Sequence, residues 1–306
     1  RGIAVNSSTH RAYIAVGDGF NSATFYVSVI DGTSDIADIA VGAGDSSTGP
    51  THIAVDETNN RVYVNHTGAN FANAINAGTN SVIGSIGTGA YPEGIVTNPA
   101  TNRLYIANTN SGNVSVIDTT GDANALVTTI GIPGAGAGIT NLYLAIIPAT
   151  NRIFVTAPGL SKIFVIDGGS NTVVQTFVVA GNPYAIIANP TTNRLYTATG
   201  GTVTVLDATT GASVAVVSVG SSTVQGLAVN TTLNHIYATS SSSSVLTVID
   251  GVTNTIHSTV NVGATTLSVG ADALSGRVYV GTSAKTVVVL SDLPTFALTV
   301  TKVGTG

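Results

Sequence analysis

A three-residue motif recurs seven times along the chain, and this repeat limits the possible folds more than any other feature. Each copy has a basic, an aliphatic and an aromatic residue, and the copies begin at Arg11, Arg61, Arg103, Arg152, Arg194, His235 and Arg277. Successive copies are 50, 42, 49, 42, 41 and 42 residues apart. The basic unit is therefore close to 42 residues, with two insertions. A period of this length is typical of an array of similar supersecondary units.

The residues of one unit predict four short strands. In the third unit, residues 94–98, 103–107, 113–118 and 125–130 read as strands, and residues 99–102 read as a turn. Pro99 fixes φ in that turn, and Asn102 tolerates a left-handed backbone. No segment of the chain keeps a 3.6-residue apolar period, so the sequence predicts almost no helix.

Repeating units of four antiparallel strands predict an all-β fold, a seven-bladed β-propeller that forms a single domain over residues 1–306. The expected blades are residues 2–48, 49–90, 91–138, 139–181, 182–221, 222–263 and 264–306. A linear β-solenoid is the alternative, but its coils are much shorter than these units. The chain begins with the first strand of blade 1 and finishes with residues 296–303 as the fourth strand of blade 7. We therefore expect no strand exchange between the termini, with Val278, Val280 and Val288 packing blade 7 on blade 1.

The recurring sequence motifs also resemble those of a known family. Ile-Ala-Val-Asn at residues 3–6, Asn-Arg-Val-Tyr-Val at 60–64 and Val-Ser-Val-Ile-Asp-Gly at 27–32 look like the YVTN-type β-propeller repeat. The resemblance covers residues 2–304 and implies the propeller fold. It leaves function open, because similar repeats occur in prokaryotic surface-layer proteins, in lyases and lactonases, and around redox cofactors.

Composition excludes several classes of protein. Charged residues make up 8% of the chain, against about 25% in a typical soluble domain. The 43% hydrophobic content argues against disorder, and no apolar run approaches the ~18 residues of a membrane span. The ten lysines and arginines are scattered and the net charge is −5, so no basic patch for nucleic acid is expected.

Cysteine and methionine are both absent, which excludes disulfides and thiolate chemistry. The absence of oxidisable sulfur suits a long-lived protein outside the cell. The chain opens on Arg1, directly before a strand, and we interpret this as the processed N-terminus of a secreted, extracellular or cell-surface protein.

Groups that recur in every blade are interpreted as structural, because a catalytic group is needed only once. This interpretation covers the motif itself and the aspartates that end the third strands, which can accept backbone N–H bonds in the next turn. They are Asp31, Asp118, Asp167, Asp207 and Asp250.

Chemistry in a propeller would sit at one mouth of the central channel, where the loops entering the innermost strands converge. Glu93 and His52, from neighbouring blades, are the only acid–base candidates there. No cofactor motif is present, and no two of the five histidines have metal-ligand spacing. Asp31, Asp35 and Asp38 lack the closing glutamate of a calcium loop, so no metal site is expected.

Four sequons mark candidate N-glycosylation sites, at Asn6, Asn65, Asn113 and Asn230.

The sequence as a whole favours a non-catalytic structural or interaction protein, a self-associating surface-layer, sheath or filament subunit. Uncharged outer strands at residues 173–179 and 296–300 support it, because unprotected sheet edges promote pairing. Its expected partner is itself, with glycans and other surface proteins as further candidates. The alternative is a propeller lyase or lactone hydrolase that uses Glu93 and His52.

Overall fold

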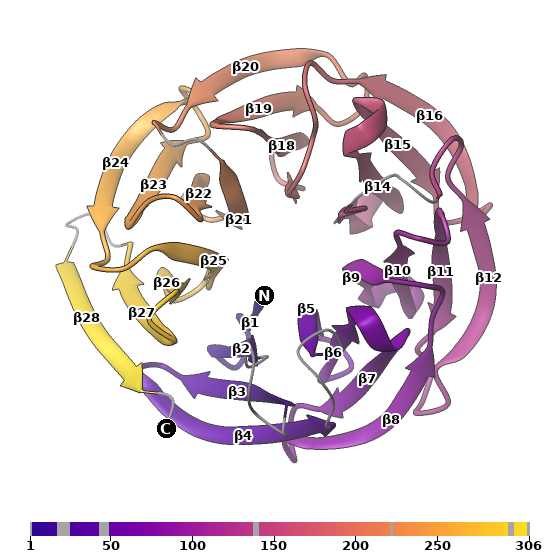
Figure 1. The fold of residues 1–306 in the computed structure, drawn as a ribbon, viewed down its shortest axis with the longest axis horizontal. Coiled ribbons are helices and arrows are strands. Elements are labelled where there is room, and N and C mark those ends of the chain that lie inside the picture. The colour runs from indigo at the N-terminus through magenta and orange to yellow at the C-terminus, as the bar shows by residue number, and fades with distance from the viewer. Residues whose placement is uncertain are drawn as a thin grey trace.

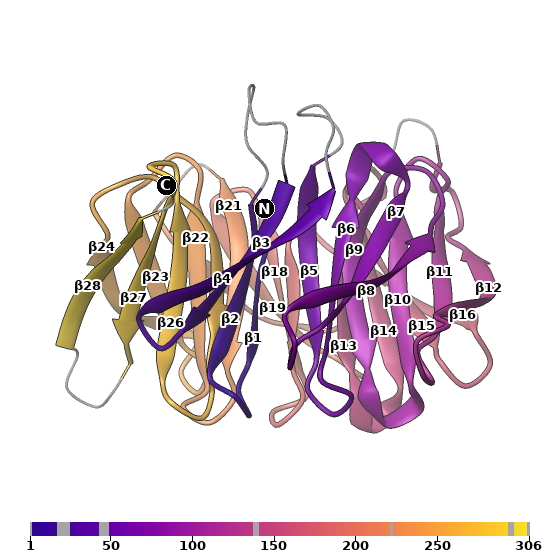
Figure 2. The same cartoon turned by 90° about the horizontal axis from the view of Figure 1, so that it is seen from below.

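The chain folds into seven four-stranded sheets arranged around a central axis (Figure 1), as a computed structural model shows. The structure describes residues 2–16, 25–42, 49–136, 141–220 and 223–292, and the backbone of residues 297–304. In every sheet the four strands are consecutive in the chain and antiparallel. The predicted seven-bladed β-propeller is therefore confirmed. Seen from the side, the strands cross the height of the ring (Figure 2).

Each blade lies within one of the predicted ranges. Blades 1 to 4 comprise β1 (Ile3–Asn6), β2 (Arg11–Val16), β3 (Phe25–Asp31) and β4 (Ser34–Gly42); β5 (Pro50–Asp56), β6 (Arg61–His66), β7 (Phe71–Asn76) and β8 (Ser81–Gly87); β9 (Pro92–Asn98), β10 (Arg103–Asn108), β11 (Asn113–Asp118) and β12 (Ala125–Gly131); β13 (Leu144–Ile147), β14 (Arg152–Ala157), β15 (Lys162–Asp167) and β16 (Thr172–Val178). Blades 5 to 7 comprise β17 (Ile186–Asn189), β18 (Arg194–Thr199), β19 (Thr202–Asp207) and β20 (Ser213–Ser218); β21 (Val224–Asn230), β22 (His235–Ser240), β23 (Val245–Asp250) and β24 (Thr255–Asn261); β25 (Thr266–Ala271), β26 (Arg277–Thr282), β27 (Thr286–Ser291) and β28 (Ala297–Gly304). Single 3₁₀ turns are the helical elements of the described residues: η1 (Thr67–Ala69), η2 (Pro99–Thr101), η3 (Pro148–Thr150) and η4 (Pro158–Leu160).

The residue before the repeated basic residue has a positive φ in all seven blades. These residues are His10, Asn60, Asn102, Asn151, Asn193, Asn234 and Gly276, with φ between 50° and 69°. Asparagine and glycine tolerate this left-handed backbone best. The left-handed backbone of the turn between the first two strands therefore explains why asparagine so often precedes the motif.

The repeated arginine and aspartate pair across the second and third strands. Arg103 lies opposite Asp118 in the register of β10 and β11, and their side chains are 3.0 Å apart. Asp118 also accepts the backbone N–H of Thr120, which lowers the pKa of its carboxyl group. The same pairing joins Arg152 to Asp167 and Arg194 to Asp207. These groups hold turns in place, as the sequence interpretation expects.

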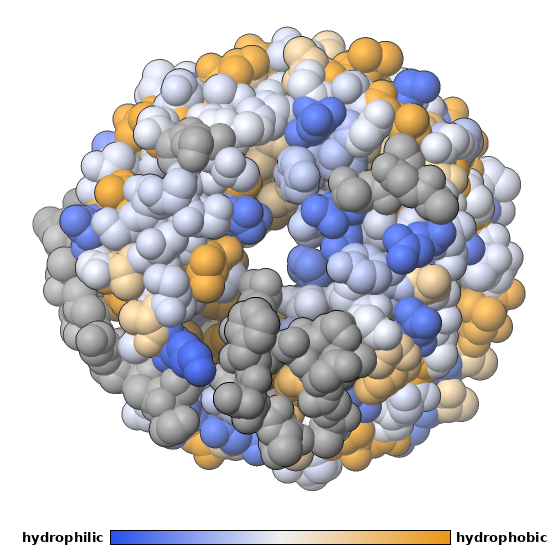
Figure 3. Space-filling model, in the orientation of Figure 1, coloured by the Kyte–Doolittle hydropathy of each residue, from blue (hydrophilic) through white to orange (hydrophobic). Residues whose placement is uncertain are grey.

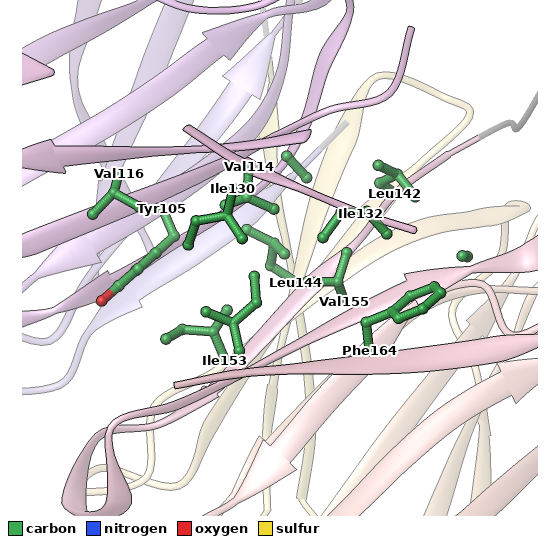
Figure 4. Packing of buried hydrophobic residues seen from close by; sticks show 13 residues of the cluster. Tyr105, Val114, Val116, Ile130, Ile132, Leu142, Leu144, Ile153, Val155 and Phe164 are labelled. Atoms are coloured by element: carbon green, nitrogen blue, oxygen red, sulfur yellow. The ribbon is translucent and has the colours of Figure 1, made fainter. Parts of the chain in front are cut away.

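The hydrophobic core lies between the blades. Seven clusters of buried side chains each combine residues of two neighbouring blades. Figure 4 shows the cluster between blades 3 and 4, to which blade 3 contributes Tyr105 and Val116 and blade 4 contributes Ile153 and Phe164. The motif tyrosines are among the largest fully buried side chains. Packing sheets face to face removes from water the apolar surface that no blade buries alone.

The ring closes without strand exchange, as predicted, because β25 to β28 form one complete sheet and β1 to β4 another. The prediction of which side chains pack blade 7 on blade 1 was wrong. Val278, Val280 and Val288 belong to the cluster shared with blade 6. The contact with blade 1 uses the alternate residues of the same strands, Tyr279, Val287 and Val289.

Candidate functional site

The innermost strand of each blade borders a central channel, which opens at the centre of Figure 3. The loops that enter these strands meet at one end of the channel, which we call the mouth. Each blade has two aligned mouth positions just before or at the start of its first strand, and half of these positions carry glycine, alanine or threonine, as at Gly94, Ala185, Gly226 and Thr266. Blades 2 to 6 each carry a larger side chain at one or both of these positions, and these side chains form the candidate site.

Glu93 is the second residue of β9, and only 7% of its surface is exposed. The Thr109 hydroxyl donates to its Oε2 at 2.8 Å. With the Asn141 amide of blade 4 oriented so that its nitrogen faces the carboxyl group, it donates to Oε1 at 2.9 Å and to Oε2 at 3.2 Å. Thr109 in turn accepts the backbone N–H of Leu142 at 3.1 Å. The carboxyl group of Glu93 therefore ties blade 3 to the segment that enters blade 4.

Burial raises the pKa of Glu93 to about 7, because a carboxylate loses hydration there, while the hydrogen bond from Thr109 opposes the rise. The Asn141 bonds also favour the charged form. Glu93 is thus a buried carboxylic acid that titrates near neutral pH.

His52 lies in β5 of blade 2, and its ring meets Tyr143 of blade 4 edge to face, with ring centroids 5.4 Å apart. Blade 3 contributes only Gly94 at the equivalent position, so no side chain of that strand separates the two rings. Burial lowers the pKa of His52 to about 3, so the imidazole is neutral. Among the described residues, its buried Nδ1 has no hydrogen-bond partner.

Glu93 and His52, the two predicted acid–base residues, are not hydrogen-bonded to each other in the described part of the chain. In the aligned repeats Glu93 matches Thr51, whereas His52 matches Gly94. They occupy successive positions, and successive side chains of a strand point to opposite faces. The pair is therefore divided between two environments.

Beside Asn141 the mouth widens into a cavity of about 620 Å³, which we call the mouth pocket. It is lined by Asn141, Tyr143, Gly181, Asn182, Tyr184, Thr199, Gly200, Thr223, Val224 and Gln225. The rings of Tyr143 and Tyr184 are tilted to one another, with centroids 6.4 Å apart. Burial raises the pKa of Tyr143 above its usual range, so its hydroxyl stays protonated.

Sequence reasoning found the mouth but not this pocket. Tyr143, Tyr184 and Gln225 are large residues at aligned mouth positions, so a signal for the pocket is present in the sequence. Acid–base catalysis points to Glu93 and His52, whereas these three side chains are uncharged at neutral pH and carry no such signal. Tyr91, next to the mouth, is marked as unusual only by the structure. Its φ is +61°, which is rare for a bulky residue, and its ring is exposed.

The four sequons lie in very different surroundings. Asn6, Asn65 and Asn230 are at most 1% exposed, and Asn65 donates to the carbonyl of Glu93. A glycan on any of these three would have to displace the side chain from the fold. Asn113, at the start of β11, is partly exposed, and it alone remains a practical acceptor.

The histidines of blades 1 and 6 are engaged with aspartates of blade 7. His10 Nδ1 lies 2.8 Å from Asp272 Oδ2, and His235 Nδ1 lies 2.8 Å from Asp292 Oδ2. His235 also packs against His257, with ring centroids 4.7 Å apart. The described residues contain no group of three or more side chains that could hold a metal ion. In the same residues, no helix has the length and apolar character needed to span a membrane.

Fold and mouth together define the class of this protein, a seven-bladed β-propeller with a polar, aromatic channel mouth. No protein-family model matches the chain, and neither does any curated protein sequence. The YVTN resemblance therefore stays a prediction.

Solved structures do match over nearly the whole chain. Hydrazine synthase of Kuenenia stuttgartiensis is 17% identical over 95% of this chain and 94% of that chain, with a TM-score of 0.78. A chain of the mitotic checkpoint complex is 15% identical over 94% and 85%, with a TM-score of 0.75. The WD40 propeller of Doa1 is 12% identical over 96% and 93%, with a TM-score of 0.74. Identities this low establish the propeller fold alone.

Proposed function

We propose that this chain is a non-catalytic structural or interaction protein of the cell surface, which associates with its own copies in a surface layer, sheath or filament. The extracellular location is supported by composition: the chain has no cysteine or methionine, and only 8% of its residues are charged. Both features are properties of the composition, so they support the location independently of the fold.

The outer rim of the propeller carries this proposal. The outermost strands of blades 2 to 6 contain no Asp, Glu, Lys or Arg. These strands follow one another around the perimeter (Figure 1). They expose large apolar side chains at Val82, Leu126, Val127, Val174, Val178, Val214, Val216 and Ile256. Charge on an edge strand prevents pairing between molecules, and here it is absent.

Each outermost strand also has a free edge. It pairs on one side with the third strand of its blade, and no described strand pairs with its other side. Backbone N–H and C=O groups on such an edge can pair with a strand of a second molecule. A contact between two copies that does not close into a ring produces a filament.

The alternative, a lyase or lactone hydrolase at the channel mouth, has one observation in its favour. Glu93 has a pKa near 7 and lies behind a polar pocket, which suits a general acid or base. Both of its oxygens already accept bonds from Thr109 and Asn141, and His52 is not its partner. The geometry therefore suits a positioning role better than proton transfer to a substrate.

Two rim residues, Val178 and Val216, are 78% and 62% exposed and test the proposal. We expect the wild-type chain to form polymers or large oligomers in sedimentation velocity and electron microscopy as its concentration rises. The double variant Val178→Lys/Val216→Lys should stay monomeric, because lysine on an edge strand blocks pairing. Leu274→Lys is the matched control, since Leu274 is 69% exposed but lies outside the rim strands. A wild-type chain that remains monomeric at high concentration would refute self-association.

A further inference from the structure

The mouth pocket has the chemistry of a small-molecule site. Its volume of about 620 Å³ falls within the range of about 300–1,000 Å³ that is usual for ligand pockets. It lies on the inner side of blades 4 to 6, whereas the apolar rim lies at the perimeter. An inference about the pocket is therefore independent of self-association.

The side chains that line the pocket are aromatic rings, amides and hydroxyls. Tyr143 and Tyr184 supply ring faces, Asn141 and Gln225 supply amides, and Thr199 supplies a hydroxyl. None of the described lining residues carries a charge. The tyrosines are only partly buried, so their rings are accessible from the pocket.

This lining discriminates between classes of ligand. A charged ligand would lose its hydration without gaining a counter-charge. A purely apolar ligand would leave the amides and hydroxyls of the pocket without hydrogen-bond partners. An uncharged ligand with hydroxyls at its edges and apolar C–H faces satisfies both requirements, since the faces pack on tyrosine rings while the hydroxyls bind amides.

The polar wall of the pocket is held in place from behind. Glu93 fixes the Asn141 amide through two hydrogen bonds, and Thr109 fixes the backbone N–H of Leu142. Because these bonds are made within the protein, they limit the ordering that the binding step requires. Nearby, Tyr91 holds a left-handed backbone with its ring exposed, and strain of this kind is concentrated at ligand sites.

We propose that the mouth pocket binds an uncharged saccharide, with Tyr143 and Tyr184 packing on sugar rings and Asn141 and Gln225 hydrogen-bonding their hydroxyls. Glu93 is a positioning residue for Asn141 and does not touch the sugar.

The test uses the full chain on an array of neutral hexose and N-acetylhexosamine oligosaccharides, with uronic-acid oligosaccharides as anionic comparators. The strongest neutral oligosaccharide is then titrated calorimetrically. We expect Tyr184→Ala and Gln225→Ala each to weaken its binding about tenfold, the effect of roughly 1.4 kcal/mol. Tyr184→Phe should keep part of the affinity, because it retains the ring face. The exposed Leu274→Ala is the control and should bind like the wild type.

Gln225 is exposed, so its variant keeps the fold even if Tyr184→Ala destabilises blade 5. Running the array with the Val178→Lys/Val216→Lys variant separates sugar binding from assembly. The proposal is overturned if no neutral saccharide binds the wild type, if only the anionic sugars bind, or if Gln225→Ala and folded Tyr184→Ala bind as tightly as the wild type.

Discussion

At the scale of the single residue, Glu93 makes the stability of the protein depend on pH. The pKa of its carboxyl group rises from 4.5, the ordinary value for glutamate, to about 7 in the folded chain. Between these values the folded state keeps a proton that the unfolded chain releases, so the contribution of Glu93 to stability is greatest below pH 4.5 and falls as the pH rises to about 7. A shift of this size corresponds to about 3 kcal/mol at most.

The substitution Glu93→Gln removes this titration. We expect the free energy of unfolding of the wild type, relative to the variant, to fall between pH 4.5 and 7 and then to level off. Denaturant unfolding at a series of pH values measures it. Gln225→Ala, an exposed substitution that removes no ionisable group, is the control and should give a flat difference. A flat difference for Glu93→Gln as well would contradict the assignment.

Several single residues could be interpreted from the sequence before the structure. Asn102 and its equivalents fill left-handed turn positions, and the third-strand aspartates accept turn N–H groups, as their residue types indicate. The separation of His52 from Glu93 could also have been predicted, because their alignment places them at successive strand positions. The pairing of Glu93 with Asn141 could not, because it depends on a long connection whose path no repeat specifies.

At the scale of the element, Gly94 sets how closely the first strands of blades 3 and 4 approach. A Cβ at this position would lie 2.7 Å from the nitrogen of Leu144 and 2.8 Å from the carbonyl oxygen of Leu142. Gly94 also donates its N–H to that carbonyl at 3.0 Å. Because the obstacle is backbone, a larger residue must push the two strands apart.

We expect Gly94→Ala to lower the free energy of unfolding by about 1–3 kcal/mol, the usual cost of overpacking. Gly131→Ala is the matched control, since a Cβ at Gly131 meets no atom within 4 Å. Denaturant titration of both variants measures the difference. Equal stabilities for the two variants would show that the strands can separate without cost.

The strands could be predicted from the sequence, but the neighbouring blade against which each strand face packs could not. Residues 103–107 and 113–118 match β10 and β11 closely, because turn residues bound them on both sides. Val278, Val280 and Val288 were assigned to the wrong neighbour of blade 7. A strand buried on both faces is apolar at every position, so alternation does not reveal which face meets which blade.

At the scale of the whole molecule, the ring closes through contacts between blades 7 and 1, which the chain does not join in sequence. A buried cluster that includes Tyr279 and Ile14 forms part of this contact. His10 adds a hydrogen bond to Asp272, whose side chain is fully buried. On the other side of the blade, His235 binds Asp292, which also accepts a hydrogen bond from Tyr237. Two histidine–aspartate pairs thus hold blade 7 to both neighbours.

Removing either histidine takes one hydrogen bond from a buried aspartate, while Ser275 still donates to Asp272 and Tyr237 to Asp292. We therefore expect His10→Ala and His235→Ala each to cost about 2 kcal/mol of unfolding free energy. Arg11→Ala breaks the exposed pair between Arg11 and Asp31 and should cost about 1 kcal/mol or less. Hydrogen exchange should then rise first in β26 and β27 and leave β14, on the far side of the ring, unchanged, because a ring held more weakly at blade 7 opens there before it unfolds elsewhere. Uniform exchange in all blades, or a cost no larger than that of Arg11→Ala, would mean that the apolar cluster alone closes the ring.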